Sequence, residues 1–167
     1  MNDIRIIDTH CHLDFIELKN RLDEVIKDAK INNVTDMVTI STNLSRIDTI
    51  KEISEQYQEV FFTVGVHPNE AHKDKQHNDY HFMKNYSKHE KCVGIGEGGL
   101  DYYYNKENMK LQKKSLEVQI NVARSTNLPM IIHSRDADDD MMASYSTAEF
   151  SKKIEKNLPN YDNRKKK

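Results

Sequence analysis

The chain has 167 residues, of which 25 are Lys or Arg and 27 are Asp or Glu, giving a formal net charge of −2. The length suffices for one domain with a hydrophobic core, and the near-neutral charge excludes a polyanion partner held by bulk charge alone. No apolar run approaches the roughly 20 residues of a membrane span, and Asp3 and Arg5 lie where a signal peptide needs an apolar core. Cys11 and Cys92 match no zinc-ribbon or redox spacing, so we expect reduced cysteines in a cytoplasmic protein that enters no membrane.

Short apolar runs alternate with helical apolar spacing along the first 142 residues. We predict strands over residues 4–9, 37–40, 60–66, 92–95 and 130–132, and helices over 18–29, 47–57, 105–128 and, on weaker spacing, 70–90. Asn105 is the predicted N-cap of the last long helix, which ends before Pro129. Strands spaced by about 30 residues are typical of parallel βα units. We therefore predict an α/β fold of the parallel TIM-barrel type, incomplete because about five of eight βα units are visible in residues 1–142, followed by a polar tail with a basic end over 143–167.

Four of the predicted strands run into a side chain that can bind a metal: His10, His67, Glu97 and His133. The carboxyl ends of parallel strands meet at one edge of the sheet, where such folds carry their chemistry. Core packing does not explain why four separate apolar runs each end in a side chain that can bind a metal. We therefore interpret Glu97 as a metal-bridging ligand and the group as a metal site.

The segment DTHCHLD places Asp8, His10, His12 and Asp14 at alternate positions, so these side chains share one face if the strand continues that far. Two imidazoles and a carboxylate suit zinc, or manganese with more oxygen ligands. A surface histidine pair is the alternative for an isolated HxH motif, and the ligand-type residues at the other strand ends favour the metal site.

The segment GIGEGG around Glu97 also satisfies the GxGxxG pattern of dinucleotide-binding proteins. That pattern closes the first strand and opens a helix, whereas here it lies in the fourth unit and is followed by the bulky run 100–104. An acid inside the loop would also repel a pyrophosphate. We therefore reject dinucleotide binding.

Three further residues at these strand ends each allow two interpretations. His67 either contacts substrate or hydrogen-bonds its own loop. Arg135 has the parity of His133 and either binds a phosphate or pairs with Asp136 or Asp138, and we prefer the phosphate. Asp101 either orients a ligand or caps the turn that follows it.

Together, DTHCHLD, GVHP, GEGGLDYYY and IIHSRDA resemble the TatD family of metal-dependent hydrolases over about residues 4–142. The resemblance implies a deoxyribonuclease, often acting from the 3′ end, with two divalent ions (Mg, Mn or Zn) and DNA as substrate. His10 and His12 would hold one ion, His133 the other, and Glu97 would bridge them. His67 and Arg135 would face the scissile phosphate.

Two later motifs of the family, an HCF-type histidine and an ETDxP-type aspartate, are missing from this sequence, and no histidine follows His133. We therefore expect a truncated family member in which each ion lacks one protein ligand. An open sheet would expose its edges, which predicts self-association or a complementing C-terminal fragment. The alternatives to a nuclease are a non-catalytic remnant, or half of an assembly, and an amidohydrolase that acts on a small amide or ester.

Overall fold

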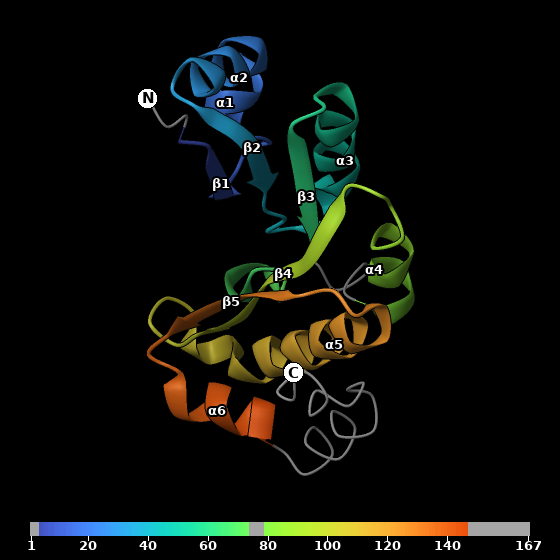
Figure 1. Ribbon diagram of the computed structural model, residues 1–167. Helices are drawn as coiled ribbons and strands as arrows, with labels where there is room; N and C mark the ends of the chain where they lie inside the picture. The colour runs from blue at the N-terminus through green and yellow to red at the C-terminus, as the bar shows by residue number, and fades with distance from the viewer. Residues whose placement is uncertain (1–3, 74–78, 147–167) are drawn as a thin grey trace, which may run out of the picture.

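The computed structural model of the chain describes residues 4–73 and 79–146, which form a curled parallel sheet with helices on its outer side (Figure 1). The strand order is β1-β2-β3-β4-β5, and every neighbouring pair is parallel. This confirms the predicted α/β fold of the parallel barrel type, with five strands of the barrel present. The strands are β1 (Ile6–Cys11), β2 (Val34–Thr39), β3 (Val60–Val64), β4 (Cys92–Asp101) and β5 (Met130–Arg135).

Helices follow the strands as the βα pattern predicts, and short 3-10 turns (η) precede three of them. None of the helices in the described ranges is both long and apolar enough to cross a bilayer. The helical elements are α1 (Ile16–Lys19), α2 (Leu22–Ile31), η1 (Leu44–Arg46), α3 (Ile47–Gln56), η2 (Pro68–Glu70), α4 (Tyr80–Tyr86), η3 (Lys106–Asn108), α5 (Met109–Thr126) and α6 (Asp138–Ser146).

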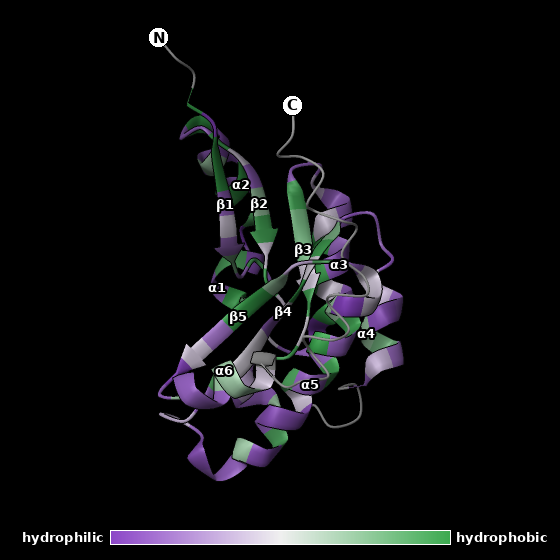
Figure 2. Ribbon diagram, turned by 60° about the horizontal axis from the view of Figure 1, so that its bottom comes forward, coloured by the Kyte–Doolittle hydropathy of each residue, from purple (hydrophilic) through white to green (hydrophobic). Residues whose placement is uncertain are grey.

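The main core lies between strands β3 and β4 and the helices that cover them. Helix α3 buries Ile47, Ile50 and Ile53 because this i, i+3, i+6 spacing keeps one face toward the sheet. Strand β3 is buried on both faces and contributes Phe62 and Val64 to the cluster that contains Ile47 and Ile50, whereas Ile53 packs in a second cluster. Figure 2 shows hydrophobic colouring concentrated on the strands and alternating with hydrophilic colouring along α5.

The two outer strands of this sheet are much less covered than β3 and β4. In β1 the exposed fractions of Ile6 and Ile7 are 46% and 58%, and in β5 that of Ile132 is 50%. Among the described residues, each of these strands has a neighbour on one side only. Apolar side chains on an open strand favour association with another surface.

Strand β4 is longer than predicted and continues through the glycines to Asp101. Its pairing with β5 extends from Ile95 opposite Met130 to Asp101 opposite Arg135. Gly99 has a φ of +157°, and a Cβ at this position would clash with the backbone carbonyl of His133. The glycine therefore allows the close approach that places the end of β4 beside the end of β5.

The predicted starts of two helices are wrong. Asn105 precedes the short turn η3 rather than capping α5, and its side-chain oxygen accepts a hydrogen bond from Asn108 Nδ2 (2.6 Å). In the polar segment 70–90, helix α4 begins only at Tyr80, where Asp79 Oδ1 accepts from the backbone N–H of Phe82 (2.8 Å). Helix α6 continues to Ser146, and the remainder of the predicted tail, residues 147–167, lies outside the described residues.

Candidate metal centre

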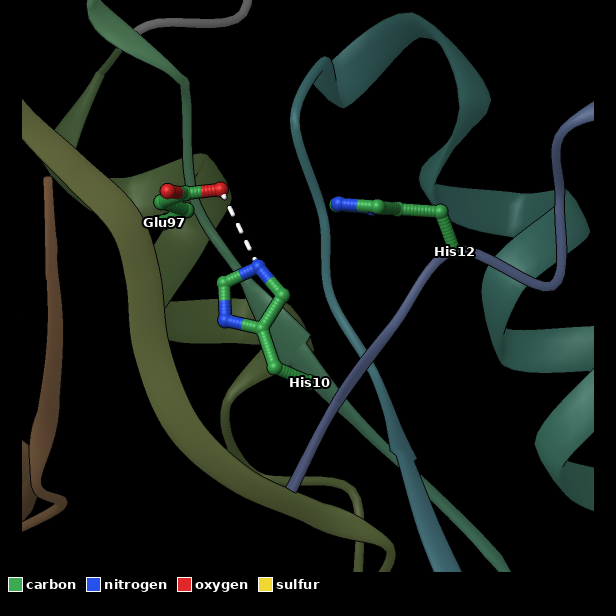
Figure 3. A group of neighbouring side chains, drawn as sticks. All are labelled: His10, His12 and Glu97. Carbon is green, nitrogen blue, oxygen red and sulfur yellow. Dashed lines mark ion pairs between the residues drawn. The ribbon is translucent and has the colours of Figure 1, made fainter. Parts of the chain in front are cut away.

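Two histidines at the end of β1 point toward Glu97 on β4, although two strands separate β1 from β4 in the sheet (Figure 3). The distance from His10 Nε2 to Glu97 Oε2 is 3.4 Å. In a flat sheet these strands would lie about 14 Å apart, at three spacings of roughly 4.8 Å. The contact therefore requires the curvature of the sheet.

His12 is oriented by a hydrogen bond to the strand beside it. Its Nδ1 lies 3.2 Å from the carbonyl oxygen of Ile40, and because a carbonyl only accepts, Nδ1 carries the proton. The lone pair is then on Nε2, the atom available to a metal. The ring also stacks on Phe15, with centroids 4.7 Å apart and planes 12° from parallel.

Glu97 uses its two carboxylate oxygens toward different partners. Oε2 faces His10, whereas Oε1 lies 3.2 Å from His133 Nδ1. The backbone N–H of Glu97 donates to the carbonyl of Ser41 (3.0 Å), which ties the residue on β4 to the segment that follows β2. The side chain is 12% exposed, so the carboxylate lies between two histidine groups with little access to water.

His133 and His67 form the second group with Glu97. His133 Nε2 lies 3.2 Å from Asp101 Oδ2 and its Nδ1 lies 3.2 Å from Glu97 Oε1, so both ring nitrogens face carboxylates and donate to them when the ring is protonated. A metal ion at Nδ1 would replace the proton on that nitrogen, while Asp101 holds the proton on Nε2. His67 Nε2 lies 3.2 Å from that Nδ1, and His67 Nδ1 accepts from the backbone N–H of Asn69 (3.1 Å). His67 therefore hydrogen-bonds within its own loop and also faces the candidate site. One contact supports the role in the loop, and the other supports the role in substrate contact.

The charges of the site favour an ionised Glu97. Burial raises the pKa of Glu97, but the hydrogen bond from His133 and the nearby His67 and His10 outweigh burial and hold the pKa below its ordinary value. The hydrogen bond to Glu97 raises the pKa of His133, whereas burial and the neighbouring His133 lower that of His67. The lowered pKa favours the neutral form of His67, and because Nδ1 accepts from Asn69, the ring proton lies on Nε2.

The residues present fit divalent metal ions. His10, His12 and Glu97 form one group of potential ligand atoms, and His67, Glu97 and His133 form another, with the atoms of each group within 4.8 Å of one another. Imidazole nitrogens with a shared carboxylate are donors that zinc, manganese and related ions accept. A carboxylate with one oxygen in each group can bridge two ions.

The other two acids of DTHCHLD belong to neither group, and the strand does not continue as far as the shared face of all four residues requires. Strand β1 ends at Cys11, and the turn that follows carries Asp14 away from the histidines. Asp14 is buried, and its Oδ2 pairs with Arg46 Nη1 at 3.2 Å. Asp8 accepts from the backbone N–H of His10 (3.0 Å) and stabilises the end of the strand instead.

A pocket of about 350 Å³ opens beside the histidines and Glu97. It brings in four residues that the sequence motifs did not indicate, namely Phe15, Thr42, Arg46 and Glu70. Arg46 lies over the ring of Phe15, with its guanidinium carbon 5.2 Å from the centroid. Local spacing offers no signal for these residues, because each comes from a loop or turn whose position depends on the sheet. A larger groove of about 530 Å³ between α2 and α3 contains no histidine or cysteine in its lining and is not the candidate site.

Arg135 lies at the end of β5, two residues beyond His133, and contacts aromatic rings rather than acids. Its guanidinium carbon is 4.4 Å from the ring centroid of Tyr103 and 4.5 Å from that of Tyr104. No ion pair joins Arg135 to Asp136 or Asp138 in the described part of the chain. The salt-bridge alternative is therefore not what the structure forms.

Asp101 fulfils both roles considered for it. One oxygen accepts from the backbone N–H groups of Tyr103 (3.1 Å) and Tyr104 (2.9 Å), and the other faces His133 Nε2. The Asp101 side chain is 1% exposed, and its pKa is lowered because the hydrogen bonds from Tyr104, Asn69 and His133 outweigh the effect of burial. The residue therefore joins the turn after β4 to the candidate ligand on β5.

These features define a protein of the parallel β/α-barrel class with a histidine and carboxylate site at the carboxyl ends of its strands. The chain belongs to the family described as TatD related DNase, whose sequence model matches residues 7–156. The uncharacterized metal-dependent hydrolase YabD of Bacillus subtilis is 38% identical over 137 residues, covering 82% of this chain and 53% of the relative. The uncharacterized metal-dependent hydrolase YcfH of Escherichia coli K12 is 31% identical over 141 residues, covering 83% and 52%. The chain thus spans about half the length of the curated relatives it matches.

Solved structures agree with this fold. The TatD homologue YjjV of Escherichia coli K12 superposes with a TM-score of 0.73 at 25% identity, covering 84% of this chain and 55% of that one. A TatD family hydrolase of Entamoeba histolytica gives a TM-score of 0.75 at 22% identity, covering 89% and 55%, and supports the fold alone.

Proposed function

We propose that this chain is a divalent-metal-dependent hydrolase of the TatD type that cleaves phosphodiester bonds of DNA, acting as a deoxyribonuclease from the 3′ end. The observation that carries the proposal is the position of Glu97, whose two oxygens face separate histidine groups. His10 and His12 would hold one ion, and His133 the other, with Glu97 between them. The names of the relatives, metal-dependent hydrolases, are consistent with this chemistry.

The ions, when bound, neutralise charge on phosphoryl oxygens and lower the pKa of a coordinated water. The chain's own residues orient the reaction. Asp101 holds the His133 ring so that Nδ1 faces the site, and His12 is held in the same way by Ile40. His67, half-buried beside His133 with its ring proton on Nε2, can donate a hydrogen bond to an oxygen of the scissile phosphate. Arg135 supplies a positive charge at the rim of the site.

The test is cleavage of 3′-labelled single-stranded DNA by the purified chain with Mg²⁺ or Mn²⁺. Cleavage should vanish with chelator and in the double variant His10→Ala/His12→Ala. His81→Ala, an exposed histidine on α4, is the matched control and should cleave like the unaltered chain. Equal cleavage by the double variant and the unaltered chain would refute the proposed site.

Two other functions would give different results in these measurements. A non-catalytic remnant, or half of an assembly, would bind fewer than two ions per chain and cleave nothing, which metal analysis of the purified chain measures. An amidohydrolase would hydrolyse a generic ester without acting on DNA. The half-exposed isoleucines of β1 and β5 support the related proposal that the chain self-associates or binds a complementing fragment. A stable monomer in size-exclusion chromatography would count against self-association.

A further inference from the structure

The turn that follows β4 presents two tyrosines to solvent on the rim of the candidate site. Tyr103 and Tyr104 have exposed fractions of 59% and 64%, although aromatic rings stabilise a fold mainly when they are buried. Their rings lie edge to face, with centroids 4.7 Å apart and an interplanar angle of 88°. More than half of each residue's surface therefore remains free to contact another planar group.

Arg135 completes this surface. Its guanidinium approaches both rings, at 4.4 and 4.5 Å from their centroids, and as a cation over aromatic faces it orders the two side chains. Arg135 itself is also exposed. We call Tyr103, Tyr104 and Arg135 the aromatic platform.

The aromatic platform is held rigidly by buried side chains. Asp101 accepts from the backbone N–H groups of both tyrosines, and Gln112 of α5 donates to the carbonyls of Asp101 (2.9 Å) and Asn105 (2.9 Å). Gln112 is fully buried, and its own oxygen accepts from the backbone N–H of Asp101 (2.8 Å). A preordered surface loses little conformational freedom when a ligand binds.

The platform is also connected directly to the candidate metal centre. The carboxylate of Asp101 that holds the tyrosine turn contacts His133 Nε2 with its other oxygen (3.2 Å). Arg135 lies two residues beyond His133 on β5, so both side chains leave the strand on the same face. A group resting on the platform would adjoin whatever is bound at the metal centre.

The surrounding charge favours a ligand recognised by its flat face more than by its phosphates. Arg135 is followed by the acidic residues Asp136 and Asp138 to Asp140, and the chain as a whole has a net charge of −2, so the platform has no excess of positive charge around it to bind phosphates. Nucleobases of a single strand stack on exposed aromatic rings and on arginine, and such stacking tolerates any base.

We propose that the aromatic platform binds single-stranded DNA by stacking unpaired nucleobases, and so selects strands with accessible bases for the neighbouring site. This inference rests on the proposed action on DNA. Double-stranded DNA offers no free base faces except at its ends and should bind more weakly.

Binding is measured by fluorescence anisotropy in the presence of a chelator, so that no strand is cleaved. The probes are a short fluorescein-labelled oligothymidylate and an abasic oligonucleotide of the same length. We expect the oligothymidylate to bind about tenfold more tightly than the abasic strand. The comparison needs no variant, and equal affinities, or no binding of either strand, would overturn the proposal.

Variants then show whether the platform causes the preference for the strand with bases. In Tyr103→Ala/Tyr104→Ala the affinity for oligothymidylate should fall to that for the abasic strand, whereas Tyr103→Phe/Tyr104→Phe keeps the rings and should keep the preference. Ile31→Ala removes an exposed apolar side chain on α2 and should bind as the unaltered chain does. An alanine double variant that melts normally and still prefers bases would assign stacking to another surface.

A second assay distinguishes a chain that does not stack bases on the platform from a chain that lacks the proposed hydrolytic activity. Hydrolysis of bis(p-nitrophenyl) phosphate, a diester without a nucleobase, reports on the metal centre alone. Metal-dependent hydrolysis of this ester without preference for bases would refute only the platform. Preference for bases without any hydrolysis would refute only the proposed function.

Discussion

Gln119 of α5 is a buried polar side chain on which the end of β3 depends. Its oxygen accepts from the backbone N–H of Val66 (3.1 Å), and its Nε2 donates to the carbonyl of the same residue (3.0 Å). Val66 is fully buried and immediately precedes His67 of the candidate site. Leucine in place of Gln119 would leave both backbone groups of Val66 without a partner and without access to water.

The expected loss follows from these two groups. Each buried backbone group left unpaired costs about 1–3 kcal/mol, and relief from desolvating the amide side chain offsets roughly 1 kcal/mol of the total. Gln119→Leu should therefore lower the free energy of unfolding by about 2–4 kcal/mol. At roughly 2–4 °C per kcal/mol for a chain of this size, the Tm should fall by about 5–15 °C.

Urea unfolding followed by circular dichroism measures this loss. Gln56→Leu is the matched control. Gln56 is exposed at the end of α3 and donates to the Tyr57 hydroxyl (3.2 Å), so its replacement should change stability by less than about 0.5 kcal/mol. If Gln119→Leu were as stable as Gln56→Leu, the two hydrogen bonds to Val66 would carry no net stabilisation and the reasoning would fail.

Three further predictions concern β4 and its partners. Gly99→Ala should lower stability by about 3 kcal/mol or more, measured by thermal melting, because its Cβ would clash with the carbonyl of His133; a change below about 1 kcal/mol would contradict the close approach. Mn²⁺ at about 100 times its dissociation constant should raise the Tm by roughly 5–10 °C. Glu97→Gln should abolish this increase, whereas the control Glu107→Gln, at an exposed site, should retain it. An unchanged Tm increase in Glu97→Gln would exclude Glu97 as a metal ligand. Burial raises the pKa of the Cys92 thiol to about 11, so at pH 8 only about one thiol in 1,000 is ionised. Cys92 of the folded chain should therefore react with iodoacetamide only after the chain unfolds. Rapid labelling of the folded chain, detected by mass spectrometry, would show an accessible thiolate and contradict this prediction.

Much of the fold could be predicted because each strand is a short apolar run and each helix after it has one apolar face. The run 60–66 is apolar at nearly every position, and β3 is indeed buried on both faces. The parallel arrangement follows from the spacing, since a helix between consecutive strands leaves little alternative. The same rule placed His10, His67, Glu97 and His133 at one edge, where the structure brings them together.

The errors occurred where a local pattern competes with a distant contact. Alternation along DTHCHLD holds only within a strand, and β1 ends at Cys11, so Asp14 turns toward Arg46 from the loop before α3. Asn105 has the side chain of an N-cap, but its side-chain oxygen accepts from the Asn108 side chain, and the 3-10 turn η3 lies between Asn105 and α5. Tyr103 and Tyr104 look like strand residues in sequence, and only Asp101, which accepts from both of their backbone N–H groups, makes them a turn.

The dispersal of the ligands along the chain has a consequence for folding kinetics. His67 and His133 are 66 residues apart, and Glu97 and His133 are 36 apart, so apart from the neighbouring pair His10 and His12 the unfolded chain holds no preassembled chelate. Parallel strands likewise form only non-local contacts, and such contacts develop late. Metal ions should therefore bind mainly after the rate-limiting step, which slows unfolding and leaves the refolding rate nearly unchanged.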